Sequence, residues 1–184
     1  RVTDPSHRDT PIVKEVQQLL GSEWSRHTLE ALTDYLVHAD RRVRFEAQWE
    51  LARRHELDTL LALATNGEFD SVGRLHALWG TDQILRMDPE VREASLKKLS
   101  PLLQDKDDVL RAAAAKVAGE RLDSGAVKRL RELLSDPSPR VQYFSILALA
   151  QLEDVDAFPG VVGRLASAEN KDAALRHAGV MYLV

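Results

Sequence analysis

The chain has 184 residues, of which 44% are hydrophobic and 29% charged, with a formal net charge of −4 and no cysteine. This is the balance of a folded domain with one buried core, and the lack of cysteine excludes disulfides, thiolate metal sites and thiol catalysis within this sequence. Charge of both signs is spread along the chain without the basic stripe that nucleic-acid binding favours, and no signal peptide or run of about 18 apolar residues is present, so we expect neither nucleic-acid binding nor direct membrane contact.

In chain order, residues 1–10 are predicted to be an extended segment and residues 11–184 a single helical domain. The first predicted helix, 11–20, starts with Pro11, where a missing backbone donor costs nothing. We expect this helix to cap the open end of a helical stack.

The rest of the chain repeats one pattern five times. Aligned positions recur at intervals of 30 to 37 residues, which is typical of stacked helical hairpins; they are Arg44, Arg74, Arg111, Gln142 and Arg176. The predicted first helices of the hairpins are 25–37, 57–64, 89–103, 125–135 and 155–167. The predicted second helices are 43–54, 72–87, 109–122, 141–152 and 172–184.

Each second helix shares two further features. Four residues before the aligned position lies a predicted helix N-cap, which is Asp40, Asp70, Asp107, Ser138 or Asp172. Three residues after it lies a small residue, which lets two helices approach closely; these are Ala47, Ala77, Ala114, Ser145 and Gly179.

The pattern resembles that of the HEAT-repeat family over about residues 25–184. The family's second-helix signature is nearly literal at Asp40, Val43, Arg44 and Ala47, and its first-helix proline has a counterpart in Pro101. The resemblance implies an all-α, right-handed α-α superhelix, a HEAT-like solenoid of about five helical hairpins. Gln142 departs from the family's arginine.

A narrower resemblance is to the helical middle of large bacterial membrane-bound dehydrogenases, in which a β-propeller precedes the repeats and a cytochrome c segment follows them. It rests on residues 1–9, on 44–48 and on 74–80. It implies that the chain is a fragment of a larger, multi-domain protein, periplasmic or exported, whose parent is an oxidoreductase. Without this resemblance the sequence assigns no compartment.

No standard catalytic motif is present, and we expect no catalytic, cofactor-binding or metal-binding residue in this sequence. The His55-Glu56 pair resembles one half of the sites of HEAT-like metal hydroxylases, which need several such pairs, so a solvated helix end is the favoured interpretation. His38, His76 and His177 lack the spacing that directs two imidazoles at one ion. The repeated arginines could bind anions, but we favour a structural role in which they hold acidic or carbonyl groups of a neighbouring turn.

The second helices also predict a binding surface. At about 100° per residue, Val43 and Ala47 define the buried side of their helix, and Phe45 and Trp49 fall on the opposite side. Second helices line the inner curve of a solenoid, so the equivalent positions would form one strip. The predicted partner-binding residues are Phe45, Trp49, Arg53, Leu75, Trp79, Lys116, Tyr143 and Leu147. In the alternative, twist of the stack and the N-terminal segment cover the aromatic residues.

The sequence therefore favours a non-enzymatic interaction or scaffold module whose strip meets a protein partner or adjacent domains of the parent chain. The alternative is a helical connector domain of an exported membrane-bound dehydrogenase that helps to shape a site with other domains.

Overall fold

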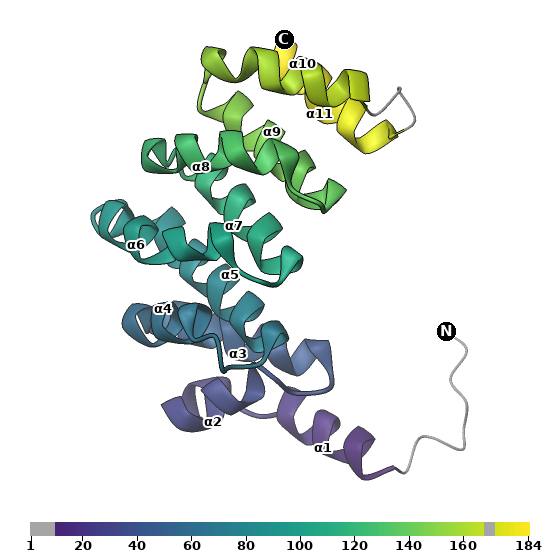
Figure 1. Cartoon of the computed structure of the whole chain (residues 1–184). Coiled ribbons are helices and arrows are strands. Elements are labelled where there is room, and N and C mark those ends of the chain that lie inside the picture. The colour runs from purple at the N-terminus through teal and green to yellow at the C-terminus, as the bar shows by residue number, and fades with distance from the viewer. Residues whose placement is uncertain (1–9, 168–171) are drawn as a thin grey trace. The chain divides into compact units, whose positions relative to one another are not determined.

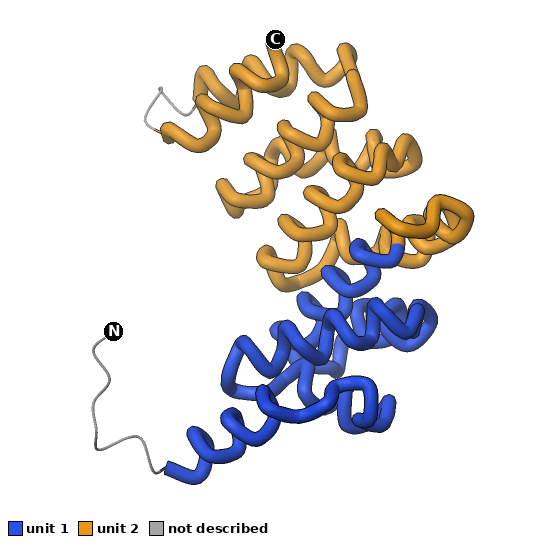
Figure 2. Tube along the Cα trace, turned by 180° about the vertical axis from the view of Figure 1, so that it is seen from behind, with its two compact units in different colours: residues 1–84 blue, residues 85–184 orange. Residues whose placement is uncertain are grey.

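The computed structural model describes residues 10–167 and 172–184, which form helices, turns and no strand. The predicted extended segment 1–10 lies almost entirely outside these residues. The chain forms two compact units, Arg1–Ile84 and Leu85–Val184 (Figure 2). The prediction of a single domain over 11–184 stays a prediction.

Unit 1 begins with α1 (Pro11–Leu20), whose bounds match the predicted helix. Its hairpins pair a short helix with a long one (Figure 1). The short helices are α2 (Leu29–Tyr35), after the 3-10 turn η2 (Trp24–Arg26), and α4 (Leu57–Thr65). The long helices are α3 (Arg41–Arg53) and α5 (Ser71–Met87), the last of which ends beyond the unit boundary.

Unit 2 repeats the arrangement, but its first helices are interrupted. They comprise α6 (Arg92–Leu99) with η3 (Ser100–Gln104), η4 (Ser124–Ala126) with α8 (Val127–Glu132) and η5 (Leu133–Ser135), and η6 (Val155–Ala157) with α10 (Phe158–Ser167). The second helices are α7 (Asp108–Glu120), α9 (Pro139–Gln151) and α11 (Ala173–Leu183).

Pro101 lies at one of these interruptions. The α-helical pattern of α6 gives way to the tighter 3-10 pattern at Ser100–Gln104, where Pro101 cannot donate a backbone hydrogen bond. The next first helix makes the same change at Leu133–Ser135, where no proline is present. Proline is therefore compatible with this change of hydrogen-bond pattern but is not needed for it.

The predicted caps and small residues account for how the long helices begin and pack. The carboxylates of Asp40, Asp70, Asp107 and Asp172 accept backbone N–H groups of the first helical turn. Ser138 is also an N-cap residue, but its hydroxyl binds Asp108 instead of capping the helix. All five small residues that follow the aligned positions are buried, as close packing requires.

Three long helices end in the same way. Each is followed by a residue in the left-handed conformation, and in none of the three is that residue a glycine. These residues are His55, Leu122 and Glu153, with φ of 58°, 56° and 53°. The amide of the next residue bonds back into the last turn, as in Asp123 N to Ala118 O at 2.8 Å. This is the Schellman arrangement, in which glycine is the usual residue at the left-handed position.

We expect Leu122→Gly to stabilise the protein by roughly 0.5–1 kcal/mol. Glycine adopts positive φ without the steric cost that Leu122 carries, and Leu122 is 64% exposed, so little apolar burial is lost. Chemical denaturation measures the change. Leu122→Ala is the control, since it removes the same exposed side chain but keeps a Cβ; equal stabilisation by both variants would contradict the backbone explanation.

Candidate functional site: an aromatic patch on unit 1

The helix α3 buries the side that its periodicity predicts, and Gln48 and Ala52, outside that side, are buried as well. Val43, Ala47 and Leu51 are fully buried, whereas Trp49 is 52% exposed. Phe45 on α3, and Leu75 and Trp79 on α5, are half-buried. The aromatic members of this set are joined to one another by contacts between their rings.

Four rings form a continuous row that joins α3 to α5. Phe45 stacks on Trp49 with ring centroids 6.1 Å apart, and His76 meets Phe45 and Trp79 edge-on, with centroids 5.2 Å away in both cases. Such arrangements are favourable beyond the area that they bury. We call Phe45, Trp49, His76 and Trp79 the aromatic patch. His76 is buried within this row, whereas Trp49 at its end keeps an exposed face.

The patch is held by a polar relay beneath it. His76 is 3% exposed; its Nδ1 lies 2.8 Å from Gln48 Oε1, and its Nε2 accepts a hydrogen bond from Arg44 Nε at 3.2 Å. Because Nε2 accepts, the proton of a neutral ring sits on Nδ1 and is donated to Gln48. Gln48 Nε2 in turn donates to Gln83 Oε1 at 3.1 Å. The relay fixes the orientation of the imidazole on which Phe45 and Trp79 pack.

This environment makes His76 sensitive to acid. Burial, followed by the positive charge of Arg44, lowers the pKa of His76 to about 4 from an ordinary 6.5. The folded state therefore holds His76 neutral, and its contribution to stability is complete above about pH 6.5 and declines as the pH falls towards 4.

We expect a loss on the order of 2 kcal/mol in the free energy of unfolding from His76 between pH 7 and pH 4. Denaturation of wild type and His76→Gln at both values measures it, since glutamine removes the titration. The difference in pH dependence between the two proteins isolates His76 from the carboxylates. Identical pH dependence in both would show that the ring takes up no proton in this range.

Of the other predicted partner-binding residues, Arg53 lies near the patch in unit 1, and Lys116, Tyr143 and Leu147 lie in unit 2. Arg53, at the end of α3, is exposed and donates to both oxygens of Glu50, at 2.8 and 2.6 Å. In unit 2, Lys116 is exposed and pairs with Glu120 at 3.4 Å, while Tyr143 and Leu147 are half-buried on α9. The row of rings joins Phe45, Trp49 and Trp79 only, and the wider strip stays a prediction.

The residues that organise the patch were not among those predicted from the sequence. His76 was interpreted only as an isolated histidine, and a relay through Gln48 and Gln83 was not expected. The available signal was Gln48, a polar residue directly after the small, buried Ala47; it is 4% exposed. A buried amide requires hydrogen-bond partners, and these would have to come from the neighbouring helix.

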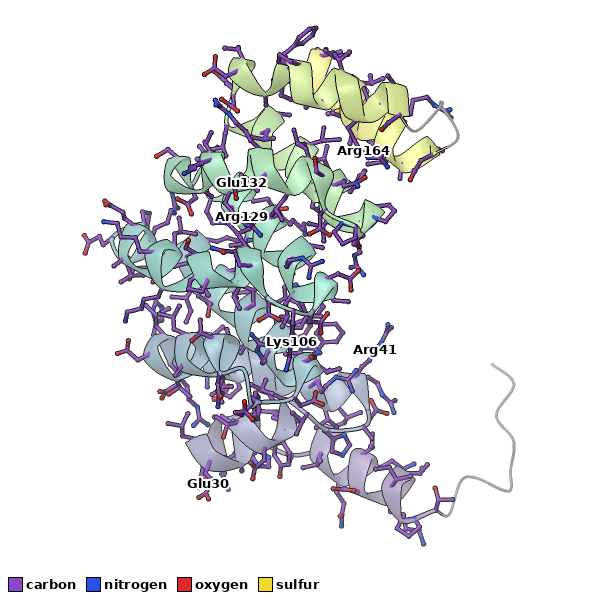
Figure 3. The ribbon with its side chains drawn as sticks, in the orientation of Figure 1. Glu30, Arg41, Lys106, Arg129, Glu132 and Arg164 are labelled. Carbon is purple, nitrogen blue, oxygen red and sulfur yellow. The ribbon has the colours of Figure 1, made fainter. Side chains whose placement is uncertain are left out.

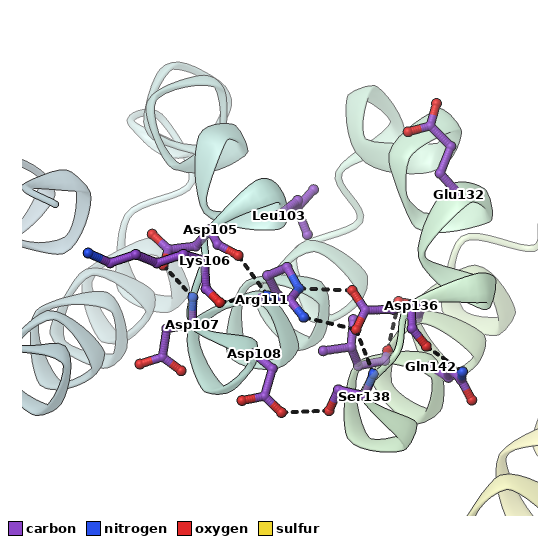
Figure 4. A network of polar contacts seen from close by, with 12 residues as sticks. Leu103, Asp105, Lys106, Asp107, Asp108, Arg111, Glu132, Asp136, Ser138 and Gln142 are labelled. Atoms are coloured by element: carbon purple, nitrogen blue, oxygen red, sulfur yellow. Dashed lines mark hydrogen bonds and ion pairs between the residues drawn. The ribbon is translucent and has the colours of Figure 1, made fainter.

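The repeated arginines have the structural role that we favoured, at least where their contacts are clearest. Arg111 Nη1 binds the carbonyls of Asp105 and Lys106, and its Nε and Nη2 bind the two oxygens of Asp136 at 2.8 and 2.9 Å (Figure 4). Arg44 similarly binds the carbonyls of His38 and Ala39. These guanidinium groups are occupied by the turns of the hairpins.

Gln142, which departs from the arginine pattern, keeps half of that role. Its amide donates to the carbonyl of Asp136, six residues earlier, as Arg111 does to Asp105. Its oxygen accepts from Arg164 of α10, so the positive charge comes from the next hairpin. Arg111 donates to Asp136 of the next hairpin, whereas Gln142 accepts from Arg164 of the next hairpin. Glutamine at the aligned position therefore keeps the contact between hairpins but exchanges the donor and the acceptor.

No histidine, aspartate or glutamate cluster suited to a metal ion occurs in the part of the chain that the structure describes. His55 is exposed at the left-handed position that ends α3, so the His55-Glu56 pair lies at a solvated helix end, as we favoured. None of the described helices is both long and apolar enough to cross a membrane.

Residues 96–183 match the family model for HEAT repeats. This part of the chain carries HEAT repeats. The match covers the hairpins of unit 2, and the all-helical hairpins of both units have the architecture expected of a HEAT-like solenoid. The HEAT-repeat family is generally non-enzymatic and generally mediates protein interactions.

A search of curated proteins found no match to the chain. Neither this search nor the family match supports the resemblance to membrane-bound dehydrogenases.

A second apolar surface lies in unit 2. A hollow of about 640 Å³ is bordered by residues of α9, η6, α10 and α11, among them Leu149, Val155, Phe158 and Met181. Phe158 is 50% exposed, nearly as much as Trp49. Phe158 therefore offers a matched comparison for Trp49 in any test of binding.

Proposed function

We propose that the chain is a non-enzymatic HEAT-repeat scaffold that binds a protein partner, or an adjacent domain of a larger parent protein, through the aromatic patch of unit 1. The observation that carries the proposal is the exposed face of Trp49 on a row of rings fixed from beneath by Gln48 and Arg44. Aromatic residues in fixed orientations are typical centres of protein interfaces, because they bury area with little loss of side-chain freedom.

The polar surroundings favour the same interpretation. Arg53 lies one helical turn beyond Trp49 and is exposed, which places a polar group beside the apolar centre. Interfaces commonly combine an apolar centre with a polar rim of this kind. Lys116, Tyr143 and Leu147, which lie in unit 2, remain candidate partner-binding residues of that unit.

Trp49→Ala is expected to weaken association by about tenfold or more without loss of helicity, since a tryptophan at the centre of an interface contributes on the order of 2 kcal/mol. Cross-linking in extracts of the source cells, with quantitative mass spectrometry, measures which proteins associate. Phe158→Ala is the matched control, because it removes an equally exposed aromatic residue from unit 2.

Association lost in Trp49→Ala and kept in Phe158→Ala would support the patch. The reverse result would move the binding site to the hollow of unit 2. Unfolding of Trp49→Ala by circular dichroism would mean that this tryptophan serves the fold. The alternative function, a helical connector that shapes a site with other domains of an exported dehydrogenase, rests on the sequence resemblance alone.

A further inference from the structure

The helix α3 carries an excess of positive charge within an acidic protein. Counted with its two caps, the helix has three acids, Asp40, Glu46 and Glu50, and five arginines, so its net charge is +2 in a chain of −4; the arginines are Arg41, Arg42, Arg44, Arg53 and Arg54. Arg41, Arg42 and Arg53 are exposed. At about 100° per residue, Arg42 and Arg53 share the face of Trp49 and lie on either side of it along the helix.

Two of the three carboxylates of α3, those of Asp40 and Glu50, are engaged by the helix itself, and Glu46 is half-buried. Asp40 caps it and binds Arg42 at 2.7 Å, and hydrogen bonding to Arg42 holds the pKa of Asp40 at about 2. Glu50 is 6% exposed and is shared by Arg53 and Arg54. These acids present few acceptors to solvent, whereas the guanidinium groups that they hold stay at the surface.

Hydrogen-bond donors on and beside the patch are unused. Within residues 10–167 and 172–184, neither the indole N–H of Trp49 nor that of Trp79 has an acceptor, and Arg41 has no ion-pair partner. Figure 3 shows Arg41 projecting from the start of α3. A surface with free donors and excess positive charge is complementary to a partner that supplies acceptors, above all carboxylates.

The same contacts argue against a nucleic acid as the partner. Nucleic-acid binding relies on several phosphate contacts at once. Arg44 is occupied by the carbonyls of His38 and Ala39, so it is not free to bind a phosphate. A partner with a few carboxylates around a bulky apolar side chain fits this arrangement better than a uniform chain of phosphates.

We propose that the aromatic patch binds an acidic segment of a protein partner, in which a bulky apolar side chain packs on Trp49 and flanking carboxylates approach Arg41 and Arg53. This inference rests on the proposed function and adds the chemistry of the partner. Because the charges lie at the surface, their attraction is screened by salt, whereas the apolar contact is not.

Three fluorescent nine-residue peptides test the inference by anisotropy with the whole chain. The first has three acidic residues on each side of a Leu-Phe-Leu centre, the second replaces the acids with lysine, and the third replaces the centre with three alanines. We expect the first to bind about tenfold more tightly than either of the others, and its affinity to fall as salt is raised from about 50 to 500 mM.

Two charge-reversal variants locate the contact. Arg41→Glu should weaken binding of the acidic apolar peptide by about threefold or more, because it replaces an attractive charge by a repulsive one. Arg140→Glu is the matched control: Arg140 is also exposed in the first turn of a long helix, but in unit 2. It should leave the affinity unchanged.

The outcomes separate this inference from the proposed function. If the lysine peptide binds as tightly as the acidic peptide, and Trp49→Ala abolishes this binding, the patch is a binding site but the inference of an acidic partner is wrong. Tighter binding of a ten-residue thymidine oligonucleotide than of the acidic peptide would overturn it in favour of nucleic acid. Binding of no peptide, or binding of the acidic peptide unaffected by Trp49→Ala, would also overturn it, and the proposed function would then depend on the cross-linking experiment alone.

Discussion

Asp136→Ala is expected to destabilise the protein by about 2–4 kcal/mol, because it leaves a buried arginine without its anion. Asp136 is 7% exposed and accepts two hydrogen bonds from Arg111 and one from the backbone of Ser138 (Figure 4). The side chain of Arg111 is only 12% exposed, so water cannot fully replace the lost carboxylate. Chemical denaturation of wild type and the variant measures the difference in the free energy of unfolding.

The control for this prediction is Asp156→Ala, which removes a carboxylate that is 76% exposed and paired with Arg131. Exposed ion pairs contribute about 0–1 kcal/mol, so this variant should be nearly as stable as wild type. Equal losses in both variants would show that the burial of Asp136 has no energetic importance.

The pH dependence of the Asp136 contact has a definite sign. Burial acts to raise its pKa, but hydrogen bonds from Arg111 and Ser138 outweigh this and lower the pKa below the ordinary 3.8. The stabilisation is therefore complete above pH 3.8 and is lost as the pH falls through the lower, folded value.

Gly119→Ala is expected to destabilise the protein by roughly 1–3 kcal/mol. A Cβ at Gly119 on α7 would lie 2.6 Å from the Cα of Ala148 on α9, so the two helices would have to move apart. The steric cost opposes the gain in helix propensity that alanine normally brings. Thermal denaturation followed by circular dichroism measures the change in the melting temperature.

Gly163→Ala provides a control with the opposite expected sign. Gly163 lies inside α10, and a Cβ there meets no atom within 4 Å. Alanine should therefore stabilise the helix by about 0.5–1 kcal/mol. If both variants are stabilised, the contact between α7 and α9 is looser than the structure shows.

Local patterns predicted most of the fold. Every long helix was predicted to start within two residues of its observed start. The signals were the proline at the start of α1, the aspartate caps and the period of apolar residues. The 3-10 segments such as Leu133–Ser135 were not predicted, because a change from α to 3-10 pattern depends on packing that no local residue type marks.

The candidate site was predictable only in part. The helical period showed that Phe45 and Trp49 lie opposite the buried Val43, which the exposure of Trp49 confirms. The relay of His76, Gln48 and Gln83 was not predictable from the period, because it depends on the register between α3 and α5. The chemistry of the proposed partner could be inferred only from the ion pairs of α3 in the structure, because the sequence does not show which arginines are paired within the helix.

The central claim, that the aromatic patch is a binding surface, is tested most directly by the indole N–H resonances in a ¹H–¹⁵N NMR titration with the acidic apolar peptide. The chain has three tryptophans, and Trp24 packs on His27 and Tyr35 away from the row of rings, so it is an internal reference. Trp-to-Phe variants assign the three signals. We predict saturable shifts of the Trp49 and Trp79 signals with that of Trp24 unchanged. Shifts of Trp24 alone, or of unit 2 amides with Trp49 and Trp79 unmoved, would contradict the claim.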